Sequence, residues 1–319
     1  MIIMNGTEFQ LEEPSAVVLG KFDGVHVGHR ALLKALKEQK EHGLKTVVFT
    51  FDKPPASLFK QGEEPYRELY TLEEKRRIFS DMGVDVLIEF PMNKETAAIP
   101  AEKFITEILQ KSLMCSVLIA GEDVSFGRGG LGDKAMLEAY SAECGFEVMI
   151  FPKLLIGEFI DSDSKDAPVS STYIRQCINA GFIANAKILL QDPFHLTGVV
   201  EHGAGLGSKV FDMPTANVKW PENKALPAFG VYYTKVSVGA KIYAAITNVG
   251  KKPTVAGEKG EVLAETYIYD FQGDLYGQNI VVRFYEYVRE EKLFEGVEVL
   301  RKQLLQDMEC GRAYWKKHF

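Results

Sequence analysis

The first half of this chain alternates apolar, strand-length runs with longer segments whose apolar residues recur at helical spacing. Such alternation is typical of a parallel sheet with helices on both faces, because each parallel strand needs a crossover to reach the next. The predicted strands cover residues 16–19, 46–51, 84–90, 117–120 and 146–151. The predicted helices cover 30–42, 102–113 and 134–144, and another begins at Thr71, with Glu74 at capping-box spacing, and ends at Gly83. The pattern predicts a doubly wound α/β domain.

Beyond about Pro193 the period of the pattern changes to two. Residues 280–287 alternate between the two faces of a strand, and similar runs occur at 195–201, 230–238, 241–249 and 263–271. Five or six antiparallel strands avoid exposed edges most simply by closing into a small barrel. A helix from about residue 295 to 316 would pack on this barrel. We therefore expect two domains, residues 1–186 and 187–319.

The composition is that of an ordinary soluble protein, with 46% hydrophobic and 25% charged residues in 319. Apolar runs are of strand length, and the first residues carry glutamates and no basic region, so we expect neither a membrane span nor a signal peptide. A net charge of −7 argues against a nucleic-acid surface. The four cysteines are widely spaced, as in reduced cytoplasmic proteins (Cys115, Cys144, Cys177 and Cys310). The sequence predicts a cytoplasmic protein with small-molecule partners and leaves its oligomeric state open.

The segment Gly20–His29, with the sequence GKFDGVHVGH, lies between the first predicted strand and the first predicted helix. Ligands bind at such turns in α/β sheets, and helix N-termini favour phosphate. Glycines at 20, 24 and 28 let the backbone approach a ligand closely. His26 and His29, three residues apart, can both point at one phosphate chain. Taken alone, an H-x-x-H pair also suits two surface histidines or a metal-binding pair.

Three separated segments resemble the bacterial riboflavin kinase/FAD synthetase family, in that family's order. They are Gly20–His29, which resembles the H-x-G-H signature of the nucleotidyltransferase superfamily, Gly121–Asp133, and Val169–Arg175. The resemblance implies that this half transfers AMP from ATP to FMN, giving FAD and pyrophosphate. Such a transfer needs no covalent enzyme intermediate, so catalysis would consist of positioning and charge stabilisation.

The resemblance also implies roles for individual residues. It makes His26, His29 and Arg175 catalytic, in contact with the ATP phosphates and the charge that grows there. Further ATP contacts are implied for Gly20, Phe22, Gly24, Gly28, Arg128, Ser170, Ser171 and Thr172. The last three also match a plain N-cap cluster opening the helix that carries Arg175.

On the flavin side the resemblance implies contacts from Asp52 and Phe126. The glycine-rich segment 126–133 is predicted to be a mobile loop beside flavin and nucleotide. The family usually has Pro-His-Pro after the second strand, whereas this chain has Thr-Phe-Asp-Lys-Pro-Pro at residues 50–55. The missing histidine affects the flavin side of the site and leaves the ATP side intact.

The second half resembles the riboflavin kinase barrel at residues 198–203, 214–217, 248–254, 265–267, 275–277 and 289–294. By resemblance, Thr215 and Asn217 would hold Mg²⁺ near the ATP phosphates. Glu265 would be the general base on the ribityl hydroxyl, and Arg289 would help to hold the flavin. This chemistry is sound, because a carboxylate can take the hydroxyl proton while a hard cation neutralises phosphate charge.

The phosphate loop of the barrel departs from the family pattern. Asp212 replaces a glycine and adds a negative charge where a polyanion should bind. Like charges about 4 Å apart repel by about 1 kcal/mol in water and by several in a sheltered site. Leu206 stands where the family often has arginine, and Tyr267 replaces the usual histidine. We therefore expect riboflavin and ATP to give little FMN.

The sequence thus predicts an FMN adenylyltransferase that uses ATP, FMN and Mg²⁺, joined to a riboflavin-kinase-like barrel of low activity. One alternative is a fully bifunctional enzyme that first phosphorylates riboflavin. A second is a non-catalytic, flavin-binding regulator. A third is an adenylyltransferase for a different phosphate acceptor, which the kinase-like barrel disfavours.

Overall fold

The computed structural model describes residues 1–55, 66–202, 215–252 and 260–318 of the chain. It divides into two compact units, Met1–Ser171 and Thr172–Phe319. The division precedes the predicted boundary at residue 186, because α6 (Ser171–Asn179) and α7 (Ile183–Leu190) group with the second unit. In that unit α7 contacts strand β12 (Asn279–Glu290).

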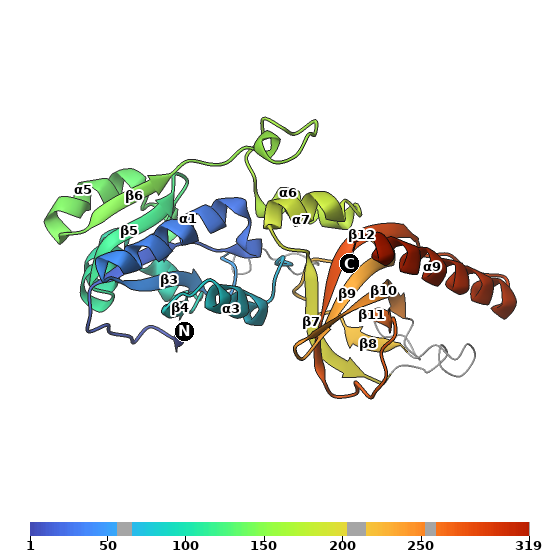
Figure 1. Cartoon of the computed structure of the whole chain (residues 1–319). Coiled ribbons are helices and arrows are strands. Elements are labelled where there is room, and N and C mark those ends of the chain that lie inside the picture. The colour runs from blue at the N-terminus through green and yellow to red at the C-terminus, as the bar shows by residue number, and fades with distance from the viewer. Residues whose placement is uncertain (56–65, 203–214, 253–259, 319) are drawn as a thin grey trace. The chain divides into compact units, whose positions relative to one another are not determined.

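The first unit is built on a six-stranded, wholly parallel sheet in the order β1-β4-β3-β2-β5-β6 (Figure 1). The strands are β1 (Ile2–Asn5), β2 (Ser15–Leu19), β3 (Lys45–Phe51), β4 (Val86–Phe90), β5 (Cys115–Gly121) and β6 (Glu147–Phe151). From β2 the chain moves outward through β3 and β4 in one direction, and through β5 and β6 in the other. This order confirms the predicted doubly wound α/β fold. The edge strand β1 adds to the prediction, since four residues are too few to show a period.

Alternate side chains of the sheet pack against helices on opposite faces. Ala16 and Val18 of β2 cluster with residues of α1 (Val27–Glu38) and α3 (Leu72–Asp81). Val17 and Leu19 cluster with residues of the π-helix η4 (Phe104–Ser112) and of α5 (Lys134–Cys144). The helices that follow β2 and β5 therefore lie on opposite faces of the sheet.

Capping explains several helix boundaries. The Thr71 hydroxyl accepts from the Glu74 N–H at 3.3 Å, and the Glu74 carboxylate accepts from the Thr71 N–H at 2.9 Å, which confirms the predicted capping box. Two helices differ from the prediction. The first begins at Val27 rather than Arg30, because the apolar stripe on which the prediction rested starts only after the first turn. The predicted helix 102–113 is a short α4 (Ala101–Lys103) that continues as η4.

The second unit is a closed six-stranded barrel in the order β10-β11-β8-β7-β12-β9, as predicted (Figure 1). Its other strands are β7 (His195–Glu201), β8 (Ala216–Lys219), β9 (Gly230–Val238), β10 (Lys241–Lys252) and β11 (Glu261–Ile268). The terminal helix α9 (Val297–His318) packs on it through Trp315, which lies in a cluster with Tyr233 and Ile246. The Trp315 indole N–H also donates to the Ala245 carbonyl at 3.1 Å.

Candidate active sites

The first unit has a topological switch point between β2 and β5, where the chain leaves neighbouring parallel strands toward opposite faces of the sheet. In open α/β sheets, ligands bind beyond the carboxyl ends of the strands at such a point. The segment that follows β2 is Gly20–His26, and the segment that follows β5 begins with Glu122 and Asp123. The sequence-predicted phosphate loop therefore lies where this fold places ligands.

The backbone of this loop is left-handed at three of four consecutive residues. Phe22 has φ 48°, Gly24 has φ 81° and Val25 has φ 44°. A non-glycine residue held in this region costs on the order of 1–3 kcal/mol and persists only where its surroundings fix it. Glycine is also needed at position 20, because a Cβ there would lie 2.9 Å from the Phe22 ring.

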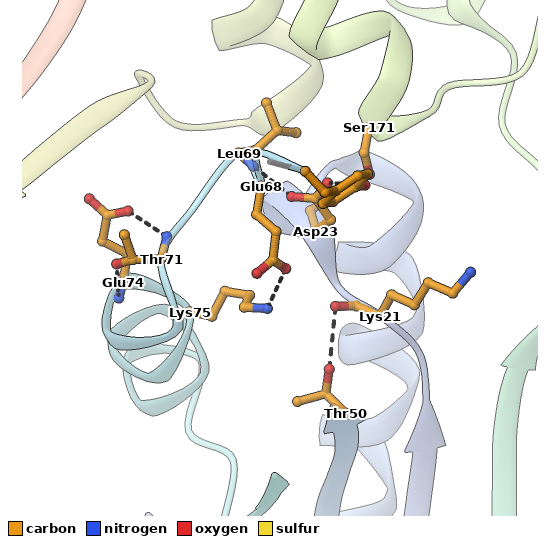
Figure 2. Close-up of polar contacts among 10 residues, drawn as sticks. Lys21, Asp23, Thr50, Glu68, Leu69, Thr71, Glu74, Lys75 and Ser171 are labelled. Atoms are coloured by element: carbon orange, nitrogen blue, oxygen red, sulfur yellow. Dashed lines mark hydrogen bonds and ion pairs between the residues drawn. The ribbon is translucent and has the colours of Figure 1, made fainter. Parts of the chain in front are cut away.

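Asp23 anchors this strained loop to the rest of the first unit (Figure 2). Its carboxylate accepts from the Leu69 N–H at 2.7 Å and from the Tyr66 hydroxyl at 3.3 Å. Its carbonyl oxygen accepts from the Ser171 hydroxyl at 2.8 Å. Arg30 Nε donates to the Val25 carbonyl at 3.1 Å and closes the other end of the loop.

His26 and His29 stack on each other, with ring centroids 3.8 Å apart. The His26 ring is buried, and the Nδ1 atoms of both rings are buried with no hydrogen-bond partner among the residues the structure describes. This burial contradicts the simple surface-histidine alternative. A buried nitrogen without a partner is costly, so two such atoms side by side indicate a site shaped for a ligand.

Both imidazoles are neutral at physiological pH. Burial lowers the pKa of His26 to about 4, against a smaller opposing effect of the Asp123 carboxylate. Burial lowers the pKa of His29 well below its usual value, and the neighbouring His26 and the Lys75 ammonium lower it further. Each neutral ring carries one N–H group, which can donate to a phosphate oxygen, and one acceptor nitrogen.

The structure places the other predicted ATP residues in different surroundings. Arg128 is exposed in a short turn, and its backbone N–H donates to Ile99 at 2.7 Å. Ser170 directly precedes Ser171, the residue that binds the Asp23 carbonyl. Thr172 and Arg175 belong to the second unit, where the guanidinium donates to the Thr172 hydroxyl at 3.2 Å.

The two predicted flavin residues of the first unit make structural contacts. The Asp52 carboxylate accepts from the Met92 N–H at 2.7 Å and so links the ends of β3 and β4. The Phe126 ring is buried in the core against Phe104, with centroids 5.4 Å apart. The segment 126–133, predicted to be a mobile loop, is closed by two backbone hydrogen bonds of 2.9 and 3.0 Å between Phe126 and Gly132.

In the barrel, antiparallel pairing aligns two predicted kinase residues, Glu265 and Asn217, with Asn248 across three strands. Glu265 of β11 pairs with Asn217 of β8 on one side and with Asn248 of β10 on the other. Directly paired residues share a face of the sheet, so these side chains are neighbours. Asn217 Nδ2 donates to the Thr215 carbonyl at 3.2 Å, and its Oδ1 is buried with no partner among the described residues. An unpartnered carboxamide oxygen next to a carboxylate fits a hard cation such as Mg²⁺.

Arg289 of β12 is held by the terminal helix. Its guanidinium donates to both carboxylate oxygens of Asp307, at distances of 2.5 to 3.2 Å. Gln303 donates to the same carboxylate at 2.8 Å. The predicted flavin residue is thus fixed in orientation by α9, at the end of β12.

Comparison with known proteins then identifies the family. Family models match FAD synthetase over residues 8–165 and riboflavin kinase over residues 190–315. The bifunctional riboflavin kinase/FMN adenylyltransferase of Escherichia coli strain K12 is 34% identical, over 95% of this chain and 94% of that protein. The protein of the same name from Bacillus subtilis strain 168 is 30% identical, over 94% and 92%. The chain belongs to the bacterial riboflavin kinase/FAD synthetase family. It is an enzyme with a nucleotidyltransferase domain.

The structure of a protein of similar length has the same fold over nearly the whole of both chains. It is described as a macrolide-efflux protein from Streptococcus pneumoniae, with 30% identity and a TM-score of 0.82, and the match covers 98% of this chain and 99% of that one. The efflux description applies to that protein alone and is not carried over to this chain. In the chain of Figure 1, no helix within the described ranges has both the length and the apolar character to cross a bilayer.

Sequence reasoning missed several residues that hold the histidine loop of the first unit. Asp23 lies inside the recognised motif, between Phe22 and Gly24, and that position was the available signal. Glu68 and Lys75 carry no pattern of their own, because a buried ion pair between a loop and a helix is a tertiary contact.

Proposed function

We propose that the first unit transfers AMP from ATP to FMN, giving FAD and pyrophosphate. The observation that carries the proposal is the stacked pair of buried, neutral imidazoles, His26 and His29, at the switch point of the sheet. An oxygen of the FMN phosphate forms a bond to the α-phosphorus of ATP while the bond to the α–β bridging oxygen breaks. Negative charge moves onto the departing pyrophosphate, where N–H donors held in place stabilise it.

The start of α1 supports the same assignment. Its first turn follows His26 directly, and the N–H groups of a first helical turn favour phosphate. We assign Gly20, Gly24 and Gly28 to the same site, since glycine lets the backbone approach a nucleotide closely. We assign the remaining ATP contacts of this unit to Phe22, Arg128, Ser170 and Ser171, and its flavin contacts to Asp52 and Phe126. The ATP contacts expected of Thr172 and Arg175, which belong to the second unit, stay predictions.

The test is to incubate the purified protein with ATP, Mg²⁺ and FMN and to resolve the products by chromatography. FAD and pyrophosphate are expected in equal amounts. No FAD at saturating ATP would overturn the proposal. Offering other phosphate monoesters in place of FMN tests the alternative of a different acceptor.

The barrel, in this proposal, binds flavin through Arg289 but phosphorylates riboflavin slowly. Glu265, the general base, lies beside Asn217, and Asn217 with Thr215 would hold Mg²⁺, which would neutralise the phosphates of bound ATP. The weakening is assigned to Asp212 and Leu206, which lie outside the described residues, and to Tyr267 beside the base.

The kinase proposal has its own test. Riboflavin and ATP should give little FMN, and Asp212→Gly, alone or with Leu206→Arg, should raise the rate. Wild-type FMN production as fast as FMN adenylylation would instead establish the fully bifunctional alternative. Flavin binding with no product from either substrate would establish the regulator.

A further inference from the structure

A buried ion pair lies under the histidine loop of the first unit. Lys75 Nζ lies 2.8 Å from Glu68 Oε1, and the two side chains are 2% and 9% exposed (Figure 2). Burying two charges is costly, and apolar residues of similar size commonly serve packing as well or better. Packing alone therefore does not explain why this ion pair is buried here.

One path from this pair leads to the strained backbone of the loop. Glu68 directly precedes Leu69, whose N–H holds the Asp23 carboxylate at 2.7 Å. Leu69 and Tyr70 are fully buried, so the chain between Glu68 and the start of α3 has little freedom. Fixing Glu68 on Lys75 fixes the donor that holds Asp23, and Asp23 lies between the left-handed residues Phe22 and Gly24.

A second path leads from Lys75 along α3 to the histidines. Phe79, one turn beyond Lys75, packs edge-on against the Phe22 ring with centroids 5.5 Å apart. The Phe22 ring in turn lies 5.2 Å from the His29 ring. The positive charge of Lys75 also acts on His29. It lowers the pKa of His29, although less than burial and the neighbouring His26 do.

We propose that Lys75 is a positioning residue for adenylyl transfer, which holds the Asp23 turn through Glu68 and sets the charge beside His29. The inference rests on the proposed transfer of AMP to FMN. Lys75 is too deeply buried to touch substrate, so it acts through the loop and through His29. Among the described residues, the charged side chains that act on the imidazoles are Lys75 from α3, on His29, and Asp123 after β5, on His26. Glu68 is paired with Lys75, and the Asp23 carboxylate is held by the Leu69 N–H.

The experiment compares Lys75→Met and Glu68→Gln with the control Arg76→Met. Arg76 is the next residue of α3 and forms a 2.5 Å ion pair with Glu89, a buried carboxylate on β4. The Arg76 side chain is 36% exposed, so the control breaks an ion pair on the same helix whose cation is partly exposed. We expect both test variants to lower kcat for FMN adenylylation by roughly tenfold or more, as loss of active-site positioning commonly does. The control should stay within about threefold of wild type.

The pH dependence separates positioning from mere stability. Loss of the Lys75 cation should raise the pKa of His29, so the acid limb of kcat/KM should move to higher pH in Lys75→Met. Loss of the Glu68 anion leaves the cation uncompensated, so Glu68→Gln should not move the limb upward. If the ion pair only stabilises the fold, the acid limb of kcat/KM should stay at the wild-type pH in both variants.

A readout without turnover keeps this inference separate from the proposed function. With six histidines in the chain, ring signals of ¹³C-labelled His26 and His29 can be assigned by single substitutions. Their pH titration should change in Lys75→Met and stay unchanged in Arg76→Met. If wild type makes no FAD, the proposed function fails, while this titration still tests the coupling.

With the single variants, three outcomes would overturn the inference: normal kcat in a folded Lys75→Met protein, equal losses in Lys75→Met and Arg76→Met, or unchanged histidine titrations. If Lys75→Met does not fold, the double variant Lys75→Met/Glu68→Met replaces it, because it leaves no unpaired charge. That variant should fold and remain slow. Full activity in it would likewise overturn the inference.

Discussion

At the scale of single residues, the first unit concentrates its unusual features in one loop. Three left-handed residues, two orphaned imidazole nitrogens and two lowered histidine pKa values all occur between Phe22 and His29. Strained backbone and perturbed titration gather at functional sites, because the rest of the fold has to supply the energy that maintains them. The loop is therefore the place where single substitutions should affect turnover most.

Replacing His29 by Ala should lower the turnover of FMN to FAD by about 10²-fold or more, as loss of one preorganised donor commonly does. Steady-state kinetics with FMN and ATP measures the change, and thermal unfolding checks that the fold is kept. A loss below threefold in a folded variant would mean that His29 is only structural.

The lowered pKa of His26 also makes stability depend on pH. The folded protein keeps this imidazole neutral down to about pH 4, whereas the unfolded chain protonates it near 6.5. Between those values the unfolded state binds more protons, so this contribution to stability is fully present above pH 6.5 and is lost as the pH falls toward 4. Urea unfolding near pH 7.5 and about pH 5 should show a smaller difference in His26→Gln than in wild type. The control, exposed His42→Gln, should keep the wild-type difference.

At the scale of elements, the terminal helix and the barrel are joined by a charged contact as well as by apolar packing. Arg289 on β12 and Asp307 on α9 form a pair whose side chains are 15% and 7% exposed. Asp307→Ala would leave a guanidinium mostly buried without its partner, which commonly costs about 3–5 kcal/mol. It should also let Arg289 turn, so that FMN binding to the barrel weakens. Urea unfolding and flavin fluorescence titration measure the two effects, and Arg312→Ala, which breaks the exposed pair with Asp270, is the matched control.

At the scale of the whole molecule, the two proposed activities act in series on the flavin. With riboflavin and ATP as the only substrates, we expect the kinase step to limit the output of FAD. Added FMN should therefore restore rapid FAD formation, and Asp212→Gly should raise FAD output from riboflavin while leaving the rate from FMN unchanged. Chromatography of riboflavin, FMN and FAD over time distinguishes these cases. Equal initial rates from riboflavin and FMN in wild type would contradict the expectation.

Much of this architecture could be predicted from the sequence because its determinants are local. The change of period from 3.6 to two near Pro193, the Thr71–Glu74 cap and the apolar strands depend on residues close together in the chain, so they predicted both the doubly wound sheet and the barrel. The position of the predicted phosphate loop was equally visible, since glycines and histidines at fixed spacing fall directly after a strand. Sequence patterns of this kind predict which residues form a candidate site.

Only the tertiary structure decided how those residues are held. Asp23 meets Leu69, Glu68 meets Lys75, and Asn217 lines up with Glu265 through contacts between separate elements that leave no spacing in the sequence. The same holds for the burial that keeps His26 neutral, and for α6 and α7 grouping with the barrel rather than with the sheet. The physical reason is that periodicity and capping are local, whereas burial, ion pairing and strand register depend on which surfaces the folded chain brings together.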